Sequence, residues 1–307
     1  MTSDGELDHE ALVESVASRL GTLRSRVRSS VHTAVSSSSS GTLLTLTLAD
    51  GSVLTPSLTP TFAGRLVSYL RGTGDVRSAA VERIALDAAR TAIEDFYTTD
   101  ETIAALGAEV VRQIDVNPAL RAALTREFAK EGLWLAGEAK ALGGPGTKAA
   151  IVGRATDAAT HAMSSALHTA GGQAVAGVAM KALMLPSVKA ALVKAILVAA
   201  HNIAFQKALA IAVKKVGVAV MAQVLLAKAA AAGGGAAVPG IGWIVTGAIL
   251  AVLTYDYLTL PEKLGTKVAD ELANSLADRG NALHLAMVAA FGESALEAIR
   301  TNLGTVR

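Results

Sequence analysis

The chain has 307 residues, enough for a sizeable core and for about one to three domains, and its formal net charge is +2. Hydrophobic residues make up 51% of the chain and aromatic residues only 4%, so the apolar excess consists of Ala, Leu and Val. The lack of cysteine excludes disulfide frameworks and cysteine-based zinc sites. The first ten residues are acidic where a secretory signal peptide would be basic and then apolar, so we expect no signal peptide and retention in the cytoplasm, unless a signal-independent route exports the protein.

The charges are unevenly distributed along the chain. Residues 151–260 contain eight basic and two acidic residues, whereas residues 1–100 contain nine basic and twelve acidic ones. Ala158 to Tyr255 contains seven lysines and neither Asp nor Glu, and the last 27 residues of this stretch carry no charge. Long apolar runs beside lysines, without acidic residues, are typical of segments that contact anionic lipid.

The first element that the sequence predicts is an amphipathic helix over residues 6–35, because apolar residues recur there at spacings of three and four. Its outer face is expected to be solvated, with an oligomerising coiled coil as the alternative. The five serines of residues 36–40 are predicted to form a linker.

A β-hairpin is predicted next, over residues 44–55. Leucines and threonines alternate up to Leu48, and Asp50-Gly51 separates this run from Val53 and Leu54. An Asp-Gly pair between two such runs favours a type I′ turn, which needs positive φ at both central residues. Because a lone hairpin is marginally stable, we expect it to pack on helices or to extend the sheet of a partner.

Residues 60–142 follow a helical pattern. The predicted helices are 60–72, 75–97, 99–112, 117–130 and 132–142. Asn117-Pro118 is expected to start one of them, with the asparagine as the cap, and Asp75 to start another. Gly143 to Gly146 is a clear break, and we place the domain boundary there.

Alanine-rich helix is expected over 147–184, with an interruption at Gly171-Gly172, and a second helix over 187–215. On a continuous helix the lysines of the second segment fall on one side, and such a basic amphipathic helix either lies in a membrane interface or covers a soluble core. With one further lysine, these are the residues expected to contact anionic lipid: Lys189, Lys194, Lys207, Lys214, Lys215 and Lys228.

Two apolar helices joined by a Gly-rich tip are predicted over residues 216–258. Ala237 to Tyr255 is 19 residues, or about 28 Å of helix, close to the thickness of a bilayer core. The first helix has a charge-free core of only 12 residues, Val216 to Ala227, which favours conditional insertion over permanent residence. The residues expected to insert are Val216, Val220, Leu225, Gly233, Gly234, Gly235, Pro239, Gly240, Trp243, Ile244, Gly247, Ile249, Leu250 and Tyr255.

After Pro261 two amphipathic helices are expected, 262–279 and 282–302, with Asn281 as the cap of the second. The predicted fold is therefore mainly α: a multi-helix bundle with one small β-hairpin in the N-terminal half and a buried or membrane-inserting apolar helical hairpin in the C-terminal half. The expected segments are 1–35, 36–40, 41–142 and 143–307.

Catalytic chemistry is not indicated. Gly143 to Lys148 lacks the glycine before the lysine and the Ser or Thr after it that a phosphate-binding loop needs. Asp157, His161 and His168 share one helix face but supply too few convergent ligands for a metal. His201 is expected to be structural, with protonation that tunes lipid binding as the alternative. We therefore expect no enzyme activity, no cofactor and no metal, and no nucleic-acid binding because the lysines are sparse and lack interleaved aromatic residues.

In its arrangement, the segment 187–260 resembles the hydrophobic helical hairpin of colicin-type bacteriocins and other α-helical pore-forming toxins. The resemblance implies a soluble bundle that hides its apolar hairpin and inserts it into a membrane after a trigger. The long receptor and translocation regions of colicins are lacking, which favours an effector acting on the inner face of its own cell's membrane, or one delivered by a partner. The expected partners are an anionic bilayer, further copies of the chain on the membrane, and an unknown protein that binds the N-terminal half.

Two other classes of function stay open at this point. One is a constitutive membrane-anchored helical scaffold. The other is a soluble α-helical protein that binds a partner and has an unusually Ala-rich core.

Overall fold

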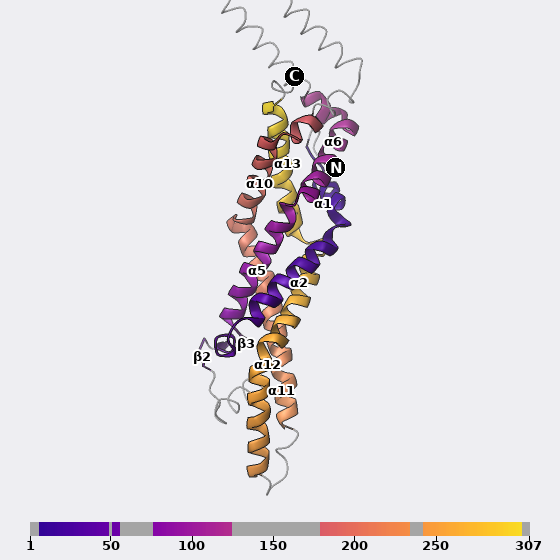
Figure 1. Ribbon diagram of the computed structural model, residues 1–307. Coiled ribbons are helices and arrows are strands. Elements are labelled where there is room, and N and C mark those ends of the chain that lie inside the picture. The colour runs from indigo at the N-terminus through magenta and orange to yellow at the C-terminus, as the bar shows by residue number, and fades with distance from the viewer. Residues whose placement is uncertain (1–5, 49–50, 56–75, 125–178, 234–241, 303–307) are drawn as a thin grey trace, which may run out of the picture. The chain divides into compact units, whose positions relative to one another are not determined.

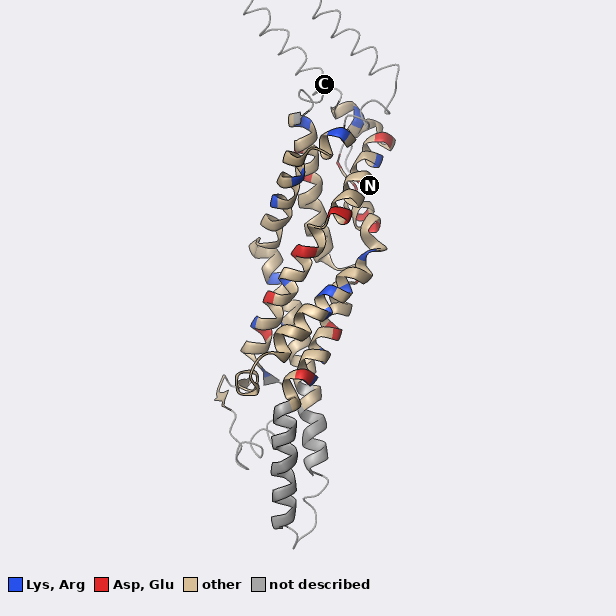
Figure 2. Cartoon of the chain, viewed as in Figure 1, with Lys and Arg blue, Asp and Glu red and all other residues tan. Residues whose placement is uncertain are grey.

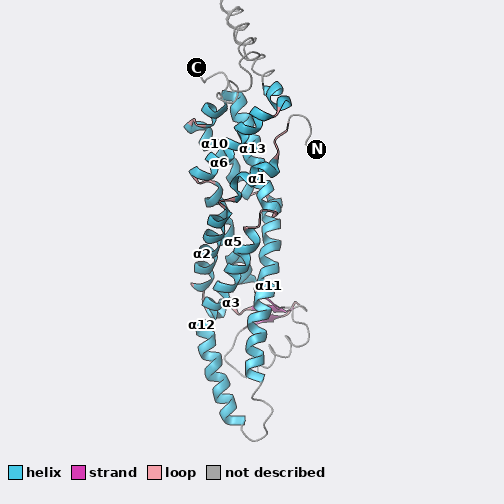
Figure 3. Cartoon of the chain, turned by 90° about the vertical axis from the view of Figure 1, so that its right-hand side faces the viewer, coloured by secondary structure: helices cyan, strands magenta, loops and turns pink. Residues whose placement is uncertain are grey.

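The computed structural model describes residues 6–48, 51–55, 76–124, 179–233 and 242–302. Most of the described residues are helical, and strands form one small sheet (Figure 3), so the prediction of a mainly α fold is confirmed. The helices predicted at 60–72 and 132–142, most of 147–184, the Gly-rich boundary at 143–146 and the Asp157, His161 and His168 group lie outside the described residues.

The chain divides into two compact units whose segments alternate along the sequence. This division differs from the consecutive segments expected from the sequence. Among the described residues, the first unit contains α1 (His9–Ala17), α6 (Asp100–Val116), α10 (Pro186–Ala200, except its last residue) and α13 (Ala282–Asn302, except its first two residues), and residues 118–124 and 179–183 are also helical. The second unit contains α2 (Leu20–Ser36), α3 (Ser40–Leu43), β1 (Leu46–Leu48), β2 (Val53–Leu54), β3 (Val76–Arg77), α5 (Ala79–Tyr97, except its last residue), α11 (Ile203–Gly233) and α12 (Gly242–Leu276) (Figure 1).

The predicted helix over 6–35 is two helices, α1 and α2, interrupted at Ser18 and Arg19. Asp8 caps α1 by accepting a hydrogen bond from the amide of Ala11. The expectation of a serine linker over 36–40 is also wrong. Ser36 is the last residue of α2, and Ser39 caps α3 by accepting from the amide of Thr42. Serine hydroxyls that bond to nearby backbone favour helix ends, so a run of serines can close one helix and start the next.

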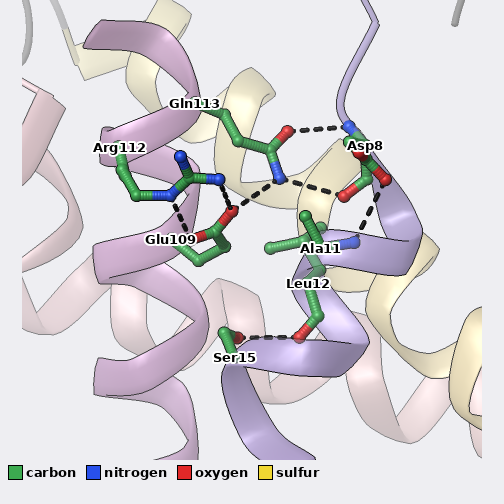
Figure 4. Close-up of polar contacts among 7 residues, drawn as sticks. All are labelled: Asp8, Ala11, Leu12, Ser15, Glu109, Arg112 and Gln113. Carbon is green, nitrogen blue, oxygen red and sulfur yellow. Dashed lines mark hydrogen bonds and ion pairs between the residues drawn. The ribbon is translucent and has the colours of Figure 1, made fainter. Parts of the chain in front are cut away.

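α1 and α6 of the first unit are joined by a polar cluster (Figure 4). The side chain of Gln113 accepts from the amide of Asp8 at 2.7 Å and donates to the carbonyl of Asp8 at 2.9 Å. Gln113 also donates to Glu109, which pairs with Arg112 through two hydrogen bonds of 2.6 and 2.7 Å. Burial raises the pKa of Glu109, but hydrogen bonds from Arg112 and Gln113 and the charge of Arg112 outweigh burial, so this pKa is lowered.

A second buried polar contact lies in the same unit. The hydroxyl of Tyr97 lies 2.7 Å from Nδ1 of His284, and both residues are buried. Burial raises the pKa of Tyr97, so its hydroxyl stays protonated. Asn281 accepts from the amide of Leu283 and Asn117 from the amides of Ala119 and Leu120, so both predicted asparagine caps are confirmed.

The predicted β-hairpin is present in the second unit, where Leu46 pairs with Leu54 in antiparallel register. Its turn differs from the prediction. The amide of Gly51 donates to Leu48, the amide of Leu48 donates to Ser52, and Gly51 has φ +81°, so the loop has three residues rather than two. The sequence also missed β3, which extends the sheet in the order β2-β1-β3 and takes residues from the start of the helix predicted at 75–97.

α2 packs along the C-terminal half of α12. Four aliphatic residues of α2 have no exposed surface: Leu23, Val27, Val31 and Val35. They face equally buried residues of the unit's core, among them Leu264, Val268 and Leu272 of α12. A Cβ added to Gly265 would crowd Oγ of Ser36 and would lie 3.1 Å from the carbonyl oxygen of His32, so the lack of a side chain lets the two helices approach closely here.

Candidate membrane-contact surface

The lysines expected on one helix lie on two. The predicted helix over 187–215 is wrong because α10 ends at Ala200 and α11 begins at Ile203. Between them, Asn202 accepts from the amide of Ala204 at 2.8 Å and so starts a new helix. Lys189 and Lys194 therefore belong to α10, whereas the other lysines belong to α11. The lysines therefore do not share one side of a single continuous helix, as the sequence predicted.

The two lysines of α10 differ in their surroundings. Nζ of Lys189 lies 2.6 Å from a carboxylate oxygen of Asp100 on α6, so this lysine is already paired. Lys194 is exposed, and so are its neighbours along the helix, Leu197 and Val198. Figure 2 shows blue lysines on α10 and no red acidic residue, which agrees with the acid-free stretch of the sequence.

α11 presents a face of alternating lysine and isoleucine to solvent. Ile203 and Ile211 are 70% and 68% exposed, and Lys207, Lys214 and Lys215 are exposed beside them. At about 100° per residue these five side chains span roughly 120° of the helix circumference. The opposite side is buried through Phe205, Leu209 and Val213. We call Ile203, Lys207, Ile211, Lys214 and Lys215 the α11 face.

Two features of the α11 face are unusual for a solvated helix. Solvated faces usually carry both signs of charge, but α11 contains no acidic residue. Isoleucine is among the residues most often fully buried, yet two of them are largely exposed here. Exposed apolar side chains between positive charges are the chemistry of a surface that enters a membrane interface.

His201 lies at the interruption between α10 and α11. Its Nδ1 is 3.6 Å from a carboxylate oxygen of Glu94, and its side chain is 57% exposed. It therefore lies partly in solvent, beside an acidic group.

The predicted apolar hairpin is formed by α11 and α12, which lie side by side (Figures 1 and 3). Val216 is half-buried and Val220 is buried. Leu225, Lys228 and Gly233 belong to α11, and six of the expected insertion residues belong to α12: Trp243, Ile244, Gly247, Ile249, Leu250 and Tyr255. Gly234, Gly235, Pro239 and Gly240 lie outside the described residues.

α12 is longer than the predicted apolar helix over 240–258. It continues through Pro261 to Leu276 and so includes most of the segment expected as a separate helix over 262–279. With 35 residues it measures about 52 Å, whereas the 17 residues of α2 measure about 26 Å. Because Ser36, the last residue of α2, lies against Gly265, α2 does not extend to the apolar half of α12.

Two stretches of the described helices have the length and apolar composition of a membrane span. Among the described residues, Ala282–Thr301 is long and apolar enough to cross a membrane, and so are Pro186–Ala200 and Ile203–Met221 taken together as a broken span. Half of Ala282–Thr301 is buried in the fold, as expected for a core helix. Within the part of the chain that the structure describes, no three His, Cys, Asp or Glu residues are grouped to hold a metal.

Comparison with known protein families, with curated proteins and with solved structures found no match to this chain.

Proposed function

We propose that this protein is a membrane-inserting effector that binds anionic lipid through the α11 face and then inserts the α11–α12 hairpin, forming a pore or disrupting the bilayer. The observation that carries the proposal is the α11 face itself: three exposed lysines and two exposed isoleucines on a helix without acidic residues. The same helix continues into the apolar hairpin, whose first arm begins with the charge-free core Val216 to Ala227.

The magnitudes favour binding that needs both kinds of side chain. Each lysine near an anionic surface contributes about 1 kcal/mol, so three contribute about 3 kcal/mol. Burying the two isoleucines contributes about 1.5–3 kcal/mol each. Ordering the protein on the surface opposes these gains, so neither the lysines nor the isoleucines alone would hold it firmly. Binding should therefore weaken with salt and with the loss of either set.

Insertion follows from the composition of the hairpin. Val220, Met221 and Val224 are buried in the resting fold. A bilayer core would bury such side chains about as well as the protein core does, so the two states can be close in free energy and a modest signal can select one. On this proposal the protein acts at the inner face of the cell membrane and assembles there with further copies, and the N-terminal half binds the partner that supplies the signal.

The test uses the purified full-length protein with vesicles of phosphatidylglycerol and phosphatidylcholine, and with vesicles of phosphatidylcholine alone. Flotation measures binding, and release of a trapped dye measures disruption. The variant Lys207→Glu/Lys214→Glu/Lys215→Glu removes the positive charge of the α11 face. Its control, Arg24→Glu/Arg83→Glu/Lys267→Glu, makes the same change in net charge at exposed residues of α2, α5 and α12 in the same unit.

We expect the wild type and the control variant to bind and permeabilise anionic vesicles, and the α11-face variant to do neither. Equal loss in both variants would mean that net charge alone governs binding. Extraction of the protein from cell membranes only by detergent, straight after synthesis, would favour the constitutive anchor. A protein that never binds anionic vesicles, at neutral or acidic pH, would favour the soluble partner-binding alternative.

A further inference from the structure

Each hairpin arm contains one residue that weakens a regular helix. Pro261 lies inside α12, where it lacks the amide that would donate to residue 257 and its ring crowds that carbonyl. Gly217 lies inside α11, one residue after the start of the apolar hairpin. Glycine in a helix interior is easily deformed because it has no side chain to restrict its backbone.

Packing does not explain the glycine at 217. A Cβ added there would meet Cγ of Glu82 at 3.7 Å, an ordinary van der Waals distance. At Gly265 the same addition would crowd Oγ of Ser36 and also the backbone of α2. The crossing of α2 and α12 is thus tight at its glycine, whereas position 217 has room for alanine.

Both residues lie where the hairpin meets a group of short elements, which we call the collar: residues 40–48 and 76–82. Within the collar, β1 pairs with β3, and the hydroxyl of Ser78 donates to the carbonyl of Leu43 at 2.7 Å. β3 packs against α11, and Glu82 lies beside Gly217. α3 packs against α12, and Pro261 is about one helical turn from Gly265, on the side of the hairpin.

We propose that Gly217 and Pro261 form a pair of hinges, one in each arm, about which the hairpin leaves its resting position while α2 stays packed on α12. This inference rests on the proposed membrane insertion, and it identifies the hairpin beyond Gly217 and Pro261 as the part that moves. The alternative is that α2 separates from α12. That step would expose Leu23, Val27, Val31 and Val35, all fully buried, whereas bending at a proline and a glycine exposes none of them.

The test is the variant Gly217→Ala/Pro261→Ala. Both changes favour a straight helix, so they should raise the thermal midpoint of unfolding and yet slow the release of dye from phosphatidylglycerol-containing vesicles. The helix propensity gained on changing glycine to alanine corresponds to about a fivefold slower release of dye in Gly217→Ala. In the double variant, dye release should be more than about tenfold slower than in the wild type. Gly217→Ala alone, which fits the observed space, keeps the test independent of any folding defect from the proline change.

Gly107→Ala is the matched control. Gly107 is a buried glycine in the middle of α6, and a Cβ added there would meet Leu183 at an ordinary 3.6 Å. This variant should also gain thermal stability but release dye at the wild-type rate.

Three results would overturn the hinge. The first is that the wild type releases dye, and the double variant binds vesicles equally well and releases dye at the same rate. This result would remove the hinge but not the proposed function. The second is an equal slowing in Gly107→Ala, which would assign the effect to stability in general. The third is a wild-type protein that binds anionic vesicles without releasing dye, which would remove the proposed insertion and the hinge together.

Discussion

The α1–α6 pair and the α2–α12 pair each join an N-terminal amphipathic helix to a helix later in the chain, but through different contacts. Hydrogen bonds join α1 to α6, where Gln113 bonds both backbone groups of Asp8. Close steric fit joins α2 to α12, through buried aliphatic residues and the approach at Gly265, and the ion pair between Arg28 of α2 and Asp270 of α12 is exposed to solvent. The first contact should therefore respond to the loss of a polar partner and to pH, and the second to added volume.

The largest expected effect is that of Gly265→Leu on the α2–α12 pair. Even its Cβ would crowd the backbone of His32 and Ser36, at 3.1 and 3.3 Å, so the helices must separate. Overpacking of this kind costs about 3 kcal/mol of unfolding free energy. Urea unfolding followed by circular dichroism measures the loss.

Gly21→Leu is the control on the other helix of the pair. No atom lies within 4 Å of a Cβ added to Gly21 of α2, so this variant should be neutral or slightly stabilising. A similar loss in both variants would show that the steric fit at Gly265 does not set the stability of the pair.

A medium effect is expected from Gln113→Leu on the α1–α6 pair. Gln113 is buried, and its loss removes the partners of the amide and carbonyl of Asp8. Losing a buried hydrogen-bond partner costs about 1–3 kcal/mol. Ser15→Ala, which removes a bond to Leu12 within α1 alone, should cost less than about 0.5 kcal/mol by the same urea measurement. Equal losses would contradict the view that hydrogen bonds between the two helices stabilise this pair.

The sequence predicted elements with strong local signals. Asn117 and Asn281 were recognised as caps because a side chain that bonds the backbone acts locally, and α13 followed from the apolar spacing of its own residues. The break at Asn202 was missed although the same cap chemistry was present, because the apolar pattern continues across it. The short strand β3 was missed because two residues carry no periodicity and depend on β1 for their pairing.

The candidate site was only partly accessible from the sequence. The hairpin of α11 and α12 and the exposed lysines Lys207, Lys214 and Lys215 were predicted from composition and spacing. The pairing of Lys189 with Asp100 could not be predicted, because the two residues are far apart in sequence. The exposure of Ile203 and Ile211 was also hidden, since isoleucine in an apolar run suggests burial and only the packing of the helix shows which side faces solvent.

The smallest expected effect is a pH dependence of the α1–α6 pair. The pKa of Glu109 lies below its ordinary value of 4.5, despite the opposing effects of burial and the nearby Asp8, because Arg112 and Gln113 stabilise the charged form. The folded state therefore favours the carboxylate, so its contribution is complete above the ordinary pKa and is lost as the pH falls through the lower, folded value. Glu109→Gln should remove this dependence, worth less than about 1 kcal/mol because Arg112 is largely exposed. This pH dependence is tested by urea unfolding midpoints measured from about pH 6 down to about pH 3, in steps of about one pH unit. If wild type and Glu109→Gln lose stability equally in acid, the charged hydrogen bonds add little, and apolar contacts stabilise α1–α6 as they do α2–α12.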